Sequence, residues 1–140
     1  MLSAVELMES HFDTLARDQA AWRLLIADEL VWELPYAPSI GHPHKLEGRA
    51  QIVSFVSAFL EDTERFSFHD LKISALANGT GAVAEVQAPA QILSTGRHYR
   101  QSYVVFLEAR DGKIVHLREY FNPATAAQAL GASIVELAAL

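Results

Sequence analysis

The chain of 140 residues carries a net charge of −6, is 51% hydrophobic and contains no cysteine. The lack of cysteine excludes disulfides, thiolate nucleophiles and cysteine-bound zinc, and the acidic balance argues against a nucleic-acid partner, which would need a basic surface. No apolar run approaches the roughly 20 residues of a bilayer span. We therefore expect one domain covering residues 1–140, located in the cytoplasm, with neither membrane nor nucleic acid as a partner.

Helix signals dominate the first half of the chain. Ser3 and Glu6 have the spacing of a capping box, and apolar residues then recur at helical spacing from Val5 to Leu15. The other elements expected here are a helix from about Gln19 to Ala27, a strand from Leu30 to Pro35, a loop from Tyr36 to Glu47 and a helix from about Arg49 to Asp62.

Strand signals separated by turns fill the second half. Asn78-Gly79 is typical of a tight hairpin, and Thr95-Gly96 and Arg110-Asp111-Gly112 are further turn candidates. These turns separate four expected strands, Phe66 to Ala77, Thr80 to Leu93, Arg97 to Ala109 and Lys113 to Phe121.

The last part of the chain returns to helix signals. Asn122 and Pro123 suit the first positions of a helix that Gly131 can end, and Ser133 with Glu136 indicates one more helical turn. Helices followed by an antiparallel meander predict an α+β fold, in which helices cover one face of a curved sheet.

Alternation along the strands predicts which side chains share the covered face of this sheet. Three sets follow: Ala82, Ala84, Val86, Ala88, Ala90 and Ile92; then Tyr99, Gln101, Tyr103, Val105 and Leu107; then Val115, Leu117, Glu119 and Phe121. The alanines of the first set leave space against a curved sheet, as a ligand cavity requires.

Assumed turn types then predict the register between strands. A two-residue loop at Thr95-Gly96, a three-residue loop ending at Gly112 and the Asn78-Gly79 turn together place His69, Ala88, Tyr103 and Glu119 in one row across the sheet. A carboxyl on an apolar face has a raised pKa, because burial disfavours its charged form, and can serve as a general acid or base near neutral pH. We expect Glu119, Tyr103 and His69 to be the catalytic residues.

The remaining candidates are weaker. Trp32 and Leu34 are expected on the core face of their strand, which sends Glu33 outward unless Pro35 introduces a bulge. The loop residues Tyr36, His42 and His44 lie where they could cover a cavity mouth. A metal needs a fixed third ligand beside the two histidines, so a solvated loop is the better interpretation, and neither a metal nor a cofactor is expected.

The outer face of the sheet mixes apolar and polar groups. Such a surface suits a protein interface better than bare solvent, and it predicts a homodimer. Its expected members are Arg100, Ser102, Val104, Phe106, His116, Arg118 and Tyr120.

Several short motifs resemble the SnoaL-like family of the nuclear transport factor 2-like superfamily. They are Gly48-Arg49, Val31-Trp32-Glu33-Leu34-Pro35, Thr95-Gly96-Arg97-x-Tyr99, Asp111-Gly112-Lys113-Ile114 and Arg118-Glu119-Tyr120-Phe121-Asn122-Pro123. The resemblance implies a cone-shaped curved sheet, antiparallel or mixed, wrapped by three N-terminal helices around an internal pocket, and usually a dimer. Polyketide cyclases, ketosteroid isomerases, epoxide hydrolases and dehydratases share this fold, so the fold alone does not settle function.

Comparing the site residues of these enzyme classes with the residues at the same places in this chain reduces the number of possible reactions. The C-terminal motif is similar to that of phenazine-biosynthesis A/B-type proteins, in which a glutamate at the place of Glu119 acts as acid and base. Epoxide hydrolases of this fold need Arg-x-Asp where this chain has Val86 and Ala88, and ketosteroid isomerases need an aspartate where it has Leu34, unless Glu33 replaces it. Both of those mechanisms are therefore disfavoured.

Two hypotheses follow. The first is a cofactor-independent isomerase, cyclase or dehydratase that acts on a small apolar cyclic or polyketide-like ligand. The second is a non-catalytic ligand-binding or dimerisation module; an acid without a nearby partner favours it, whereas an acid close to His69 or Tyr103 favours catalysis. The expected ligand contacts are Gln101, Trp32, Leu34, Tyr36, Val86, Ala88, Leu117 and Phe121.

Overall fold

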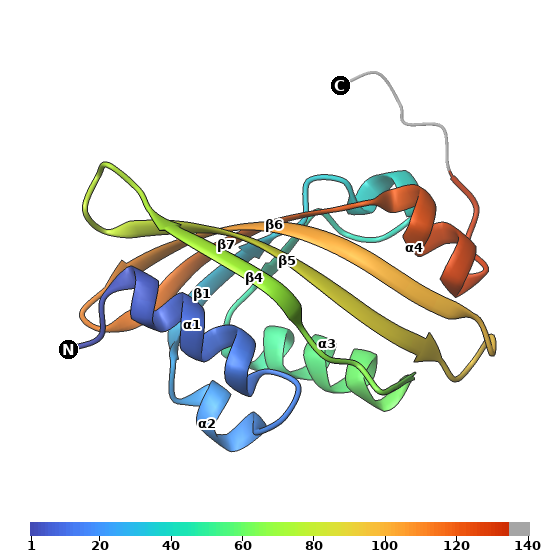
Figure 1. Cartoon of the computed structure of the whole chain (residues 1–140), viewed down its shortest axis with the longest axis horizontal. Coiled ribbons are helices and arrows are strands. Elements are labelled where there is room, and N and C mark those ends of the chain that lie inside the picture. Colours follow the sequence, from blue (N-terminus) through green and yellow to red (C-terminus); the bar gives the residue numbers. More distant parts are fainter. Residues whose placement is uncertain (135–140) are drawn as a thin grey trace.

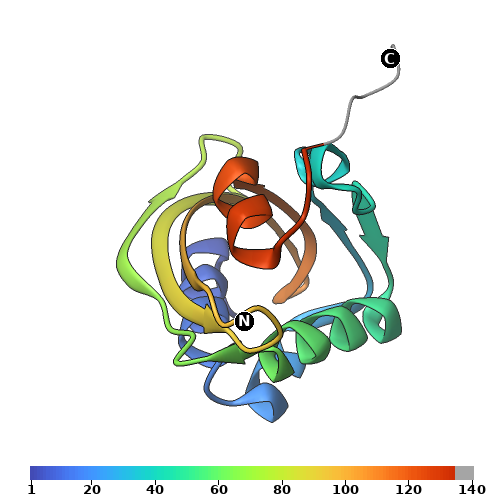
Figure 2. The same cartoon turned by 90° about the vertical axis from the view of Figure 1, so that its right-hand side faces the viewer.

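A strongly curled mixed sheet forms a half-barrel in the computed structural model, which describes residues 1–134 (Figures 1 and 2). The strand order is β2-β1-β7-β6-β5-β3, and β4 also pairs with β5. β1 runs parallel to β7, whereas the other pairs are antiparallel. The strands are β1 (Ile26–Glu33), β2 (Lys45–Glu47), β3 (Thr63–Glu64), β4 (His69–Ala75), β5 (Gly81–Ile92), β6 (His98–Arg110) and β7 (Lys113–Phe121). The predicted α+β fold is confirmed.

Helices close the concave side of the half-barrel. They are α1 (Ala4–Thr14), α2 (Gln19–Arg23), α3 (Arg49–Glu61) and α4 (Pro123–Leu130), with a short 3-10 helix, η1, at Ala37–Ile40. α3 touches β1 and β2 on one edge of the sheet and β3 on the other, so it spans the opening, while α4 lies over β6 and η1 (Figure 2).

The predicted helix ends are largely confirmed. Ser3 and Glu6 form the capping box of α1, and the side chain of Asn122 caps α4, which ends at Gly131 in the left-handed conformation. The further turn expected at Ser133 to Glu136 extends beyond the described residues.

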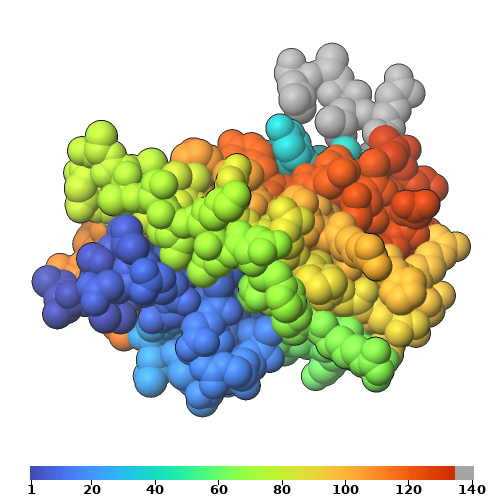
Figure 3. Space-filling view, in the orientation of Figure 1, coloured from blue at the N-terminus to red at the C-terminus, as the bar shows by residue number. Residues whose placement is uncertain are grey.

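The main core packs α1 against the concave face of the sheet. Leu7 and Met8 of α1 are fully buried against this face, together with Trp22 of α2. β4 lies directly beside α1, as the neighbouring yellow-green and blue surfaces of Figure 3 show. A second, smaller cluster lies beneath α4 and includes Ile92 and Tyr99.

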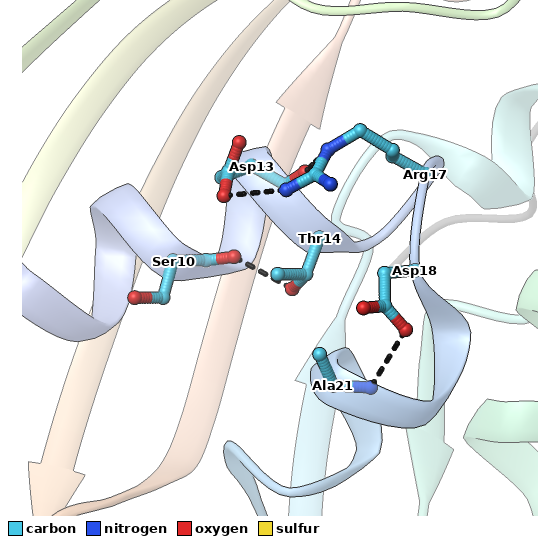
Figure 4. A network of polar contacts seen from close by, with 6 residues as sticks. All are labelled: Ser10, Asp13, Thr14, Arg17, Asp18 and Ala21. Atoms are coloured by element: carbon cyan, nitrogen blue, oxygen red, sulfur yellow. Dashed lines mark hydrogen bonds and ion pairs between the residues drawn. The ribbon is translucent and has the colours of Figure 1, made fainter.

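Local hydrogen bonds fix the turn between α1 and α2 (Figure 4). The Thr14 hydroxyl donates to the Ser10 carbonyl at 2.6 Å, and Arg17 pairs with Asp13 at 2.8 Å. Asp18 then caps α2 by accepting from the backbone N–H of Ala21 at 3.1 Å. This tight turn brings the indole of Trp22, the buried residue of α2, back against α1.

The first strand and its surroundings differ from the prediction. α2 ends at Arg23 instead of Ala27, because Ile26 already pairs with Ile114 of β7. Arg49 holds this junction by donating to the Arg23 carbonyl at 2.8 Å. The loop expected from Tyr36 to Glu47 contains η1 and also β2, which pairs with the end of β1.

The predicted register between β5, β6 and β7 is wrong by two residues at each pairing. The β5–β6 loop is longer than expected, so Tyr103 lies opposite Val86, not Ala88. Between β6 and β7, a tighter turn at Asp111-Gly112 and a bulge place Glu119 opposite Val105. A slip of two residues leaves every side chain on its predicted face, since strand side chains alternate with period two.

The placement of His69 is a different error. The β4–β5 pairing follows the prediction from Ala75 back to Lys72, and a bulge then intervenes at Asp70, whose φ is +56°. The bulge shifts the register by one residue, so His69 pairs with Gln87 of the outer face. His69 is exposed and bonds to Ser67 at 2.7 Å, so it does not join the predicted row on the concave face.

Candidate active site

A cavity of about 400 Å³ fills the space between the half-barrel and its helices. This volume lies within the range of small-molecule sites. Its wall is mostly aliphatic and aromatic. It is lined by His11, Phe12, Leu15, Trp32, Leu34, Ala37, Ile40, His42, Pro43, Leu46, Phe55, Val56, Ala58, Phe59, Asp62, Phe66, Phe68, Tyr99, Tyr103, Glu119, Phe121, Ala126 and Leu130.

Glu119 presents a carboxyl to this cavity. The residue lies on the concave face of β7, with the aliphatic side chain of Val105 across the ladder. Its side chain is half-buried and borders the cavity. Protein surrounds the group, and this burial raises the pKa of Glu119 from 4.5 to about 8. The carboxyl is therefore mainly protonated at neutral pH.

Two tyrosines lie on the neighbouring strand. The hydroxyls of Tyr99 and Tyr103 are 3.4 Å apart, and the Gln101 amide donates to Tyr99 at 3.2 Å. Because Tyr99 accepts from this amide, its own proton is free for Tyr103, whose hydroxyl hydrogen can then point to a ligand. Burial raises the pKa of both tyrosines, so they stay protonated.

Gln101 itself is not available to a ligand, which corrects its predicted role as a contact. Its side chain is buried and also donates to the Asn122 carbonyl at 3.0 Å. Its oxygen accepts the backbone N–H groups of Asn122, at 2.8 Å, and of Ser102, at 3.0 Å. All four hydrogen-bonding positions of the amide are thus filled. Gln101 ties β6 to the start of α4 and supports Tyr99.

The structure brings five of the predicted site residues to the cavity wall: Glu119, Tyr103, Trp32, Leu34 and Phe121. The open question about the first strand is also resolved. Leu34 lines the cavity, whereas Glu33 faces outward and lies 3.2 Å from the ring of His116.

Four other predicted placements are corrected. Val86, Ala88 and Leu117 do face inward, but they are covered by the packed core and do not border the cavity. Tyr36 is half-exposed on the outer side, where its ring packs edge-on against Tyr120 at 5.4 Å.

Sequence reasoning missed His11, Tyr99 and an aromatic wall of the cavity. The wall comprises Phe55 and Phe59 on α3 with Phe66 and Phe68. The ring of Phe66 contacts those of Phe59 and Phe68 edge to face at about 5 Å. The apolar face of α3 was visible in the sequence, but the contacts of the two phenylalanines before β4 arise only in the folded chain. His11 had a weak signal: it lies on the α1 face that carries the core residues Leu7 and Met8.

The two loop histidines separate in the structure. His42 borders the cavity beside Pro43, both exposed, whereas His44 does not line it. Among residues 1–134, no group of three or more histidine, aspartate or glutamate side chains is arranged to hold a metal ion.

In the same part of the chain, no helix has the length and hydropathy needed to cross a bilayer.

The outer face of the sheet carries an aromatic and cationic patch. The Arg118 guanidinium lies 4.8 Å from the ring centre of Phe106 and 6.0 Å from that of Tyr120. Arg118 Nε is buried, and no residue in the described part of the chain accepts its hydrogen bond.

Residues 6–117 match the family model described as the SnoaL-like domain. The chain belongs to this family. Two relatives are each 34% identical: the Bacillus subtilis "Uncharacterized protein YesE", over 87% of this chain and 82% of that protein, and the Pseudomonas aeruginosa "Uncharacterized PhzA/B-like protein PA3332", over 81% and 79%. The latter agrees with the resemblance seen in the C-terminal motif.

Solved structures agree with the fold of this SnoaL-like domain. A protein named "Putative Isomerase from Bacillus subtilis" superposes with a TM-score of 0.82 at 32% identity, covering 95% of this chain and 96% of that one. An NTF2-like protein from Burkholderia xenovorans superposes with a TM-score of 0.75 at 21% identity, covering 90% and 94%. The second likeness is evidence for the nuclear transport factor 2-like fold alone.

Proposed function

We propose that this SnoaL-like protein binds a neutral apolar cyclic compound in its cavity and transfers a proton with Glu119. The observation that carries the proposal is a carboxyl group inside an apolar cavity, with burial raising its pKa to about 8. A group titrating near neutral pH can both give and take a proton under working conditions. Isomerisation, cyclisation and dehydration all use such a group, and none requires a cofactor.

The simplest step is enolisation of a ketone. The Glu119 carboxylate takes a proton from the carbon next to the carbonyl, the C–H electron pair forms the carbon–carbon double bond, and the carbonyl π pair moves to oxygen. Tyr103, supported by Tyr99 and Gln101, can donate a hydrogen bond to that oxygen. When the ketone also carries a β,γ double bond, the oxygen pair re-forms the carbonyl, the enolate double bond shifts to the α,β position, and the β,γ electron pair takes the proton of Glu119 at the γ carbon. This completes an isomerisation to the conjugated ketone.

The name of one structural relative supports this reading. The Bacillus subtilis protein at 32% identity carries the word isomerase in its name. For this chain, isomerase activity remains a proposal that depends on the cavity and its acid.

A second candidate function, ligand binding without catalysis, is favoured by one observation. No residue among the described ones forms a hydrogen bond with the Glu119 carboxyl. A protonated carboxyl both donates and accepts, so it could hold a ligand without moving a proton to or from carbon.

Deuterium exchange separates the two functions. A bicyclic ketone such as 1-tetralone is incubated with the protein in D₂O, and deuterium at the carbon next to the carbonyl is followed by NMR. Catalysis predicts exchange that falls about 10²-fold in Glu119→Gln, which preserves shape and removes the titration. Ketone that binds equally to both proteins and exchanges at the buffer rate would establish the binding function instead.

We also propose that two copies pair through the outer sheet face. The patch of Phe106, Arg118 and Tyr120 supports this arrangement, because aromatic residues and arginine are enriched in protein interfaces.

A further inference from the structure

His11 is a buried histidine that the proton-transfer scheme does not use. It lies on the inner side of α1, is 1% exposed and borders the cavity. Trp22 of α2 donates its indole N–H to His11 Nδ1 at 3.0 Å. Burial lowers the pKa of His11 from 6.5 to about 4, so the ring is neutral at pH 7. With Nδ1 accepting, the single ring proton must be on Nε2.

Trp32 places a second N–H donor beside this ring. The ring centres of His11 and Trp32 are 6.0 Å apart, and both residues line the cavity. The indole N–H of Trp32 is buried and has no partner within residues 1–134. Within the same range, the side-chain hydrogen bond of the His11 ring is the one that Nδ1 accepts from Trp22, which leaves Nε2 for a ligand. Buried donors in folded proteins are almost always paired, so the unpaired indole N–H of Trp32 at this cavity is unusual.

Both groups can only donate, and the other acidic or basic side chains of the wall are Glu119, Asp62 and His42. The lining residues include no lysine or arginine. Trp32 pairs with Leu117 in the β1–β7 ladder, two residues from Glu119 on the same strand. The two donors therefore lie near the acid but come from different elements, α1 and β1, whereas the tyrosine pair comes from β6.

We propose that His11 and Trp32 form a donor pair that binds a neutral acceptor oxygen of the ligand. The ligand class is then an apolar cyclic compound with a carbonyl group, such as a ketone, lactone or quinone. An anion would enter without a cationic partner, and a purely hydrocarbon ligand would leave both donors unpaired. The inference rests on the proposed binding of an apolar ligand in this cavity, but not on proton transfer by Glu119.

The chain contains two tryptophans, Trp22 and Trp32, so it has two indole N–H signals in a ¹⁵N-labelled sample. The labelled protein is titrated with 1-tetralone and, separately, with tetralin, the hydrocarbon of the same skeleton. The donor pair predicts that the Trp32 indole proton shifts downfield with the ketone but not with the hydrocarbon. Equal shifts with both compounds would overturn the inference. So would an indole N–H that stays bonded to a water molecule after the ketone has bound.

Matched variants distinguish ligand binding from a structural role of the histidine. His11→Asn keeps an oxygen near the Nδ1 position for Trp22 but cannot reach the cavity, whereas His11→Gln can place an N–H near the Nε2 position. The donor pair predicts that 1-tetralone affinity falls about three- to tenfold in His11→Asn and in Trp32→Phe and is retained in His11→Gln. Tetralin affinity should be unchanged in all three.

If His11 has only a structural role, the order of the 1-tetralone affinities is reversed, because His11→Asn then resembles the wild type and His11→Gln does not. Failure of any variant to fold leaves the wild-type indole titration as the deciding experiment. The same ketone separates this inference from the proposed function. If deuterium exchange is lost in Glu119→Gln but His11→Asn still prefers 1-tetralone to tetralin as the wild type does, the donor pair alone is refuted. If that preference depends on His11 but no exchange is catalysed, catalysis alone is refuted.

Discussion

Glu119 lies directly across the β6–β7 ladder from Val105, and Tyr103 lies one step along, opposite Phe121. The carboxyl therefore has an aliphatic neighbour where a hydroxyl was expected. This arrangement explains why burial, and not a charge partner, raises the pKa of Glu119. It also leaves the group open to whatever occupies the cavity.

The pH dependence of stability reports this burial. The folded protein keeps the Glu119 proton up to about pH 8, whereas an ordinary glutamate loses it near 4.5. Between these values the folded state binds more protons than the unfolded state, so the free energy of unfolding falls as pH rises, by at most about 1.4 kcal/mol per pH unit. Urea unfolding of wild type and Glu119→Gln across this range should show the slope in the wild type only.

His11 acts in the opposite direction in the acidic part of this range. Its pKa is lowered from 6.5 to about 4, so the unfolded state binds more protons there and stability falls as pH drops. The Glu119 slope should therefore be least disturbed above about pH 7.5, one unit beyond the ordinary histidine value, where His11 is mostly neutral in both states. Equal slopes of the two proteins in that window would contradict the assignment.

The pH profile of ketone exchange is a second prediction. If the Glu119 carboxylate is the base, the protein-catalysed rate should rise about tenfold per pH unit below 8 and level off above it, because the basic form accumulates as the carboxyl titrates. NMR measurement of deuterium uptake gives this profile. Subtracting the rate of Glu119→Gln at each pH removes the hydroxide reaction, and a remaining rate independent of pH would argue against this base.

We expect the hydrogen bonds of Gln101 to increase the free energy of unfolding. Gln101→Leu leaves the main-chain N–H and C=O of Asn122 without the partners they now have, and we expect the free energy of unfolding to fall by about 2 kcal/mol. Gln87→Leu is the matched control, because Gln87 is exposed on the outer face and, within residues 1–134, its side chain forms a hydrogen bond with Ser102 alone. Urea unfolding should show a change within about 0.5 kcal/mol for the control. Similar losses in both variants would mean that the Gln101 bonds add little.

The outer face predicts the oligomeric state. Light scattering should give the mass of a dimer at micromolar concentration, and Phe106→Glu should shift it to a monomer by placing a charge in the aromatic patch. His98→Glu, at an exposed position nearer the end of the same strand, is the control and should remain dimeric. A wild-type monomer would remove the proposed pairing.

Sequence patterns predicted correctly that Glu119 and Tyr103 face the concave side, but not which residues lie opposite one another on neighbouring strands. Alternation placed Glu119 and Tyr103 on the correct face, because errors of two residues do not change the side to which a strand residue points. The rows depended on loop lengths at Thr95-Gly96 and Asp111-Gly112, which sequence specifies only loosely. The bulge at Asp70 had no signal in the sequence and removed His69 from the site.

The cavity wall was less predictable than the sheet. His11 became a candidate only when the turn after α1 brought Trp22 onto its Nδ1 atom. Gln101 pointed inward as expected, but its partners on Asn122 could not be inferred from alternation. Such contacts depend on tertiary packing between distant segments.

The most direct test is the titration of one carboxyl group. With ¹³C-labelled glutamate, the side-chain carboxyl signal of Glu119 is assigned by its absence in Glu119→Gln and followed by NMR as pH rises. A carboxyl buried in the cavity predicts a midpoint near pH 8. A midpoint near 4.5, the value of a solvated glutamate, would contradict the proposed chemistry.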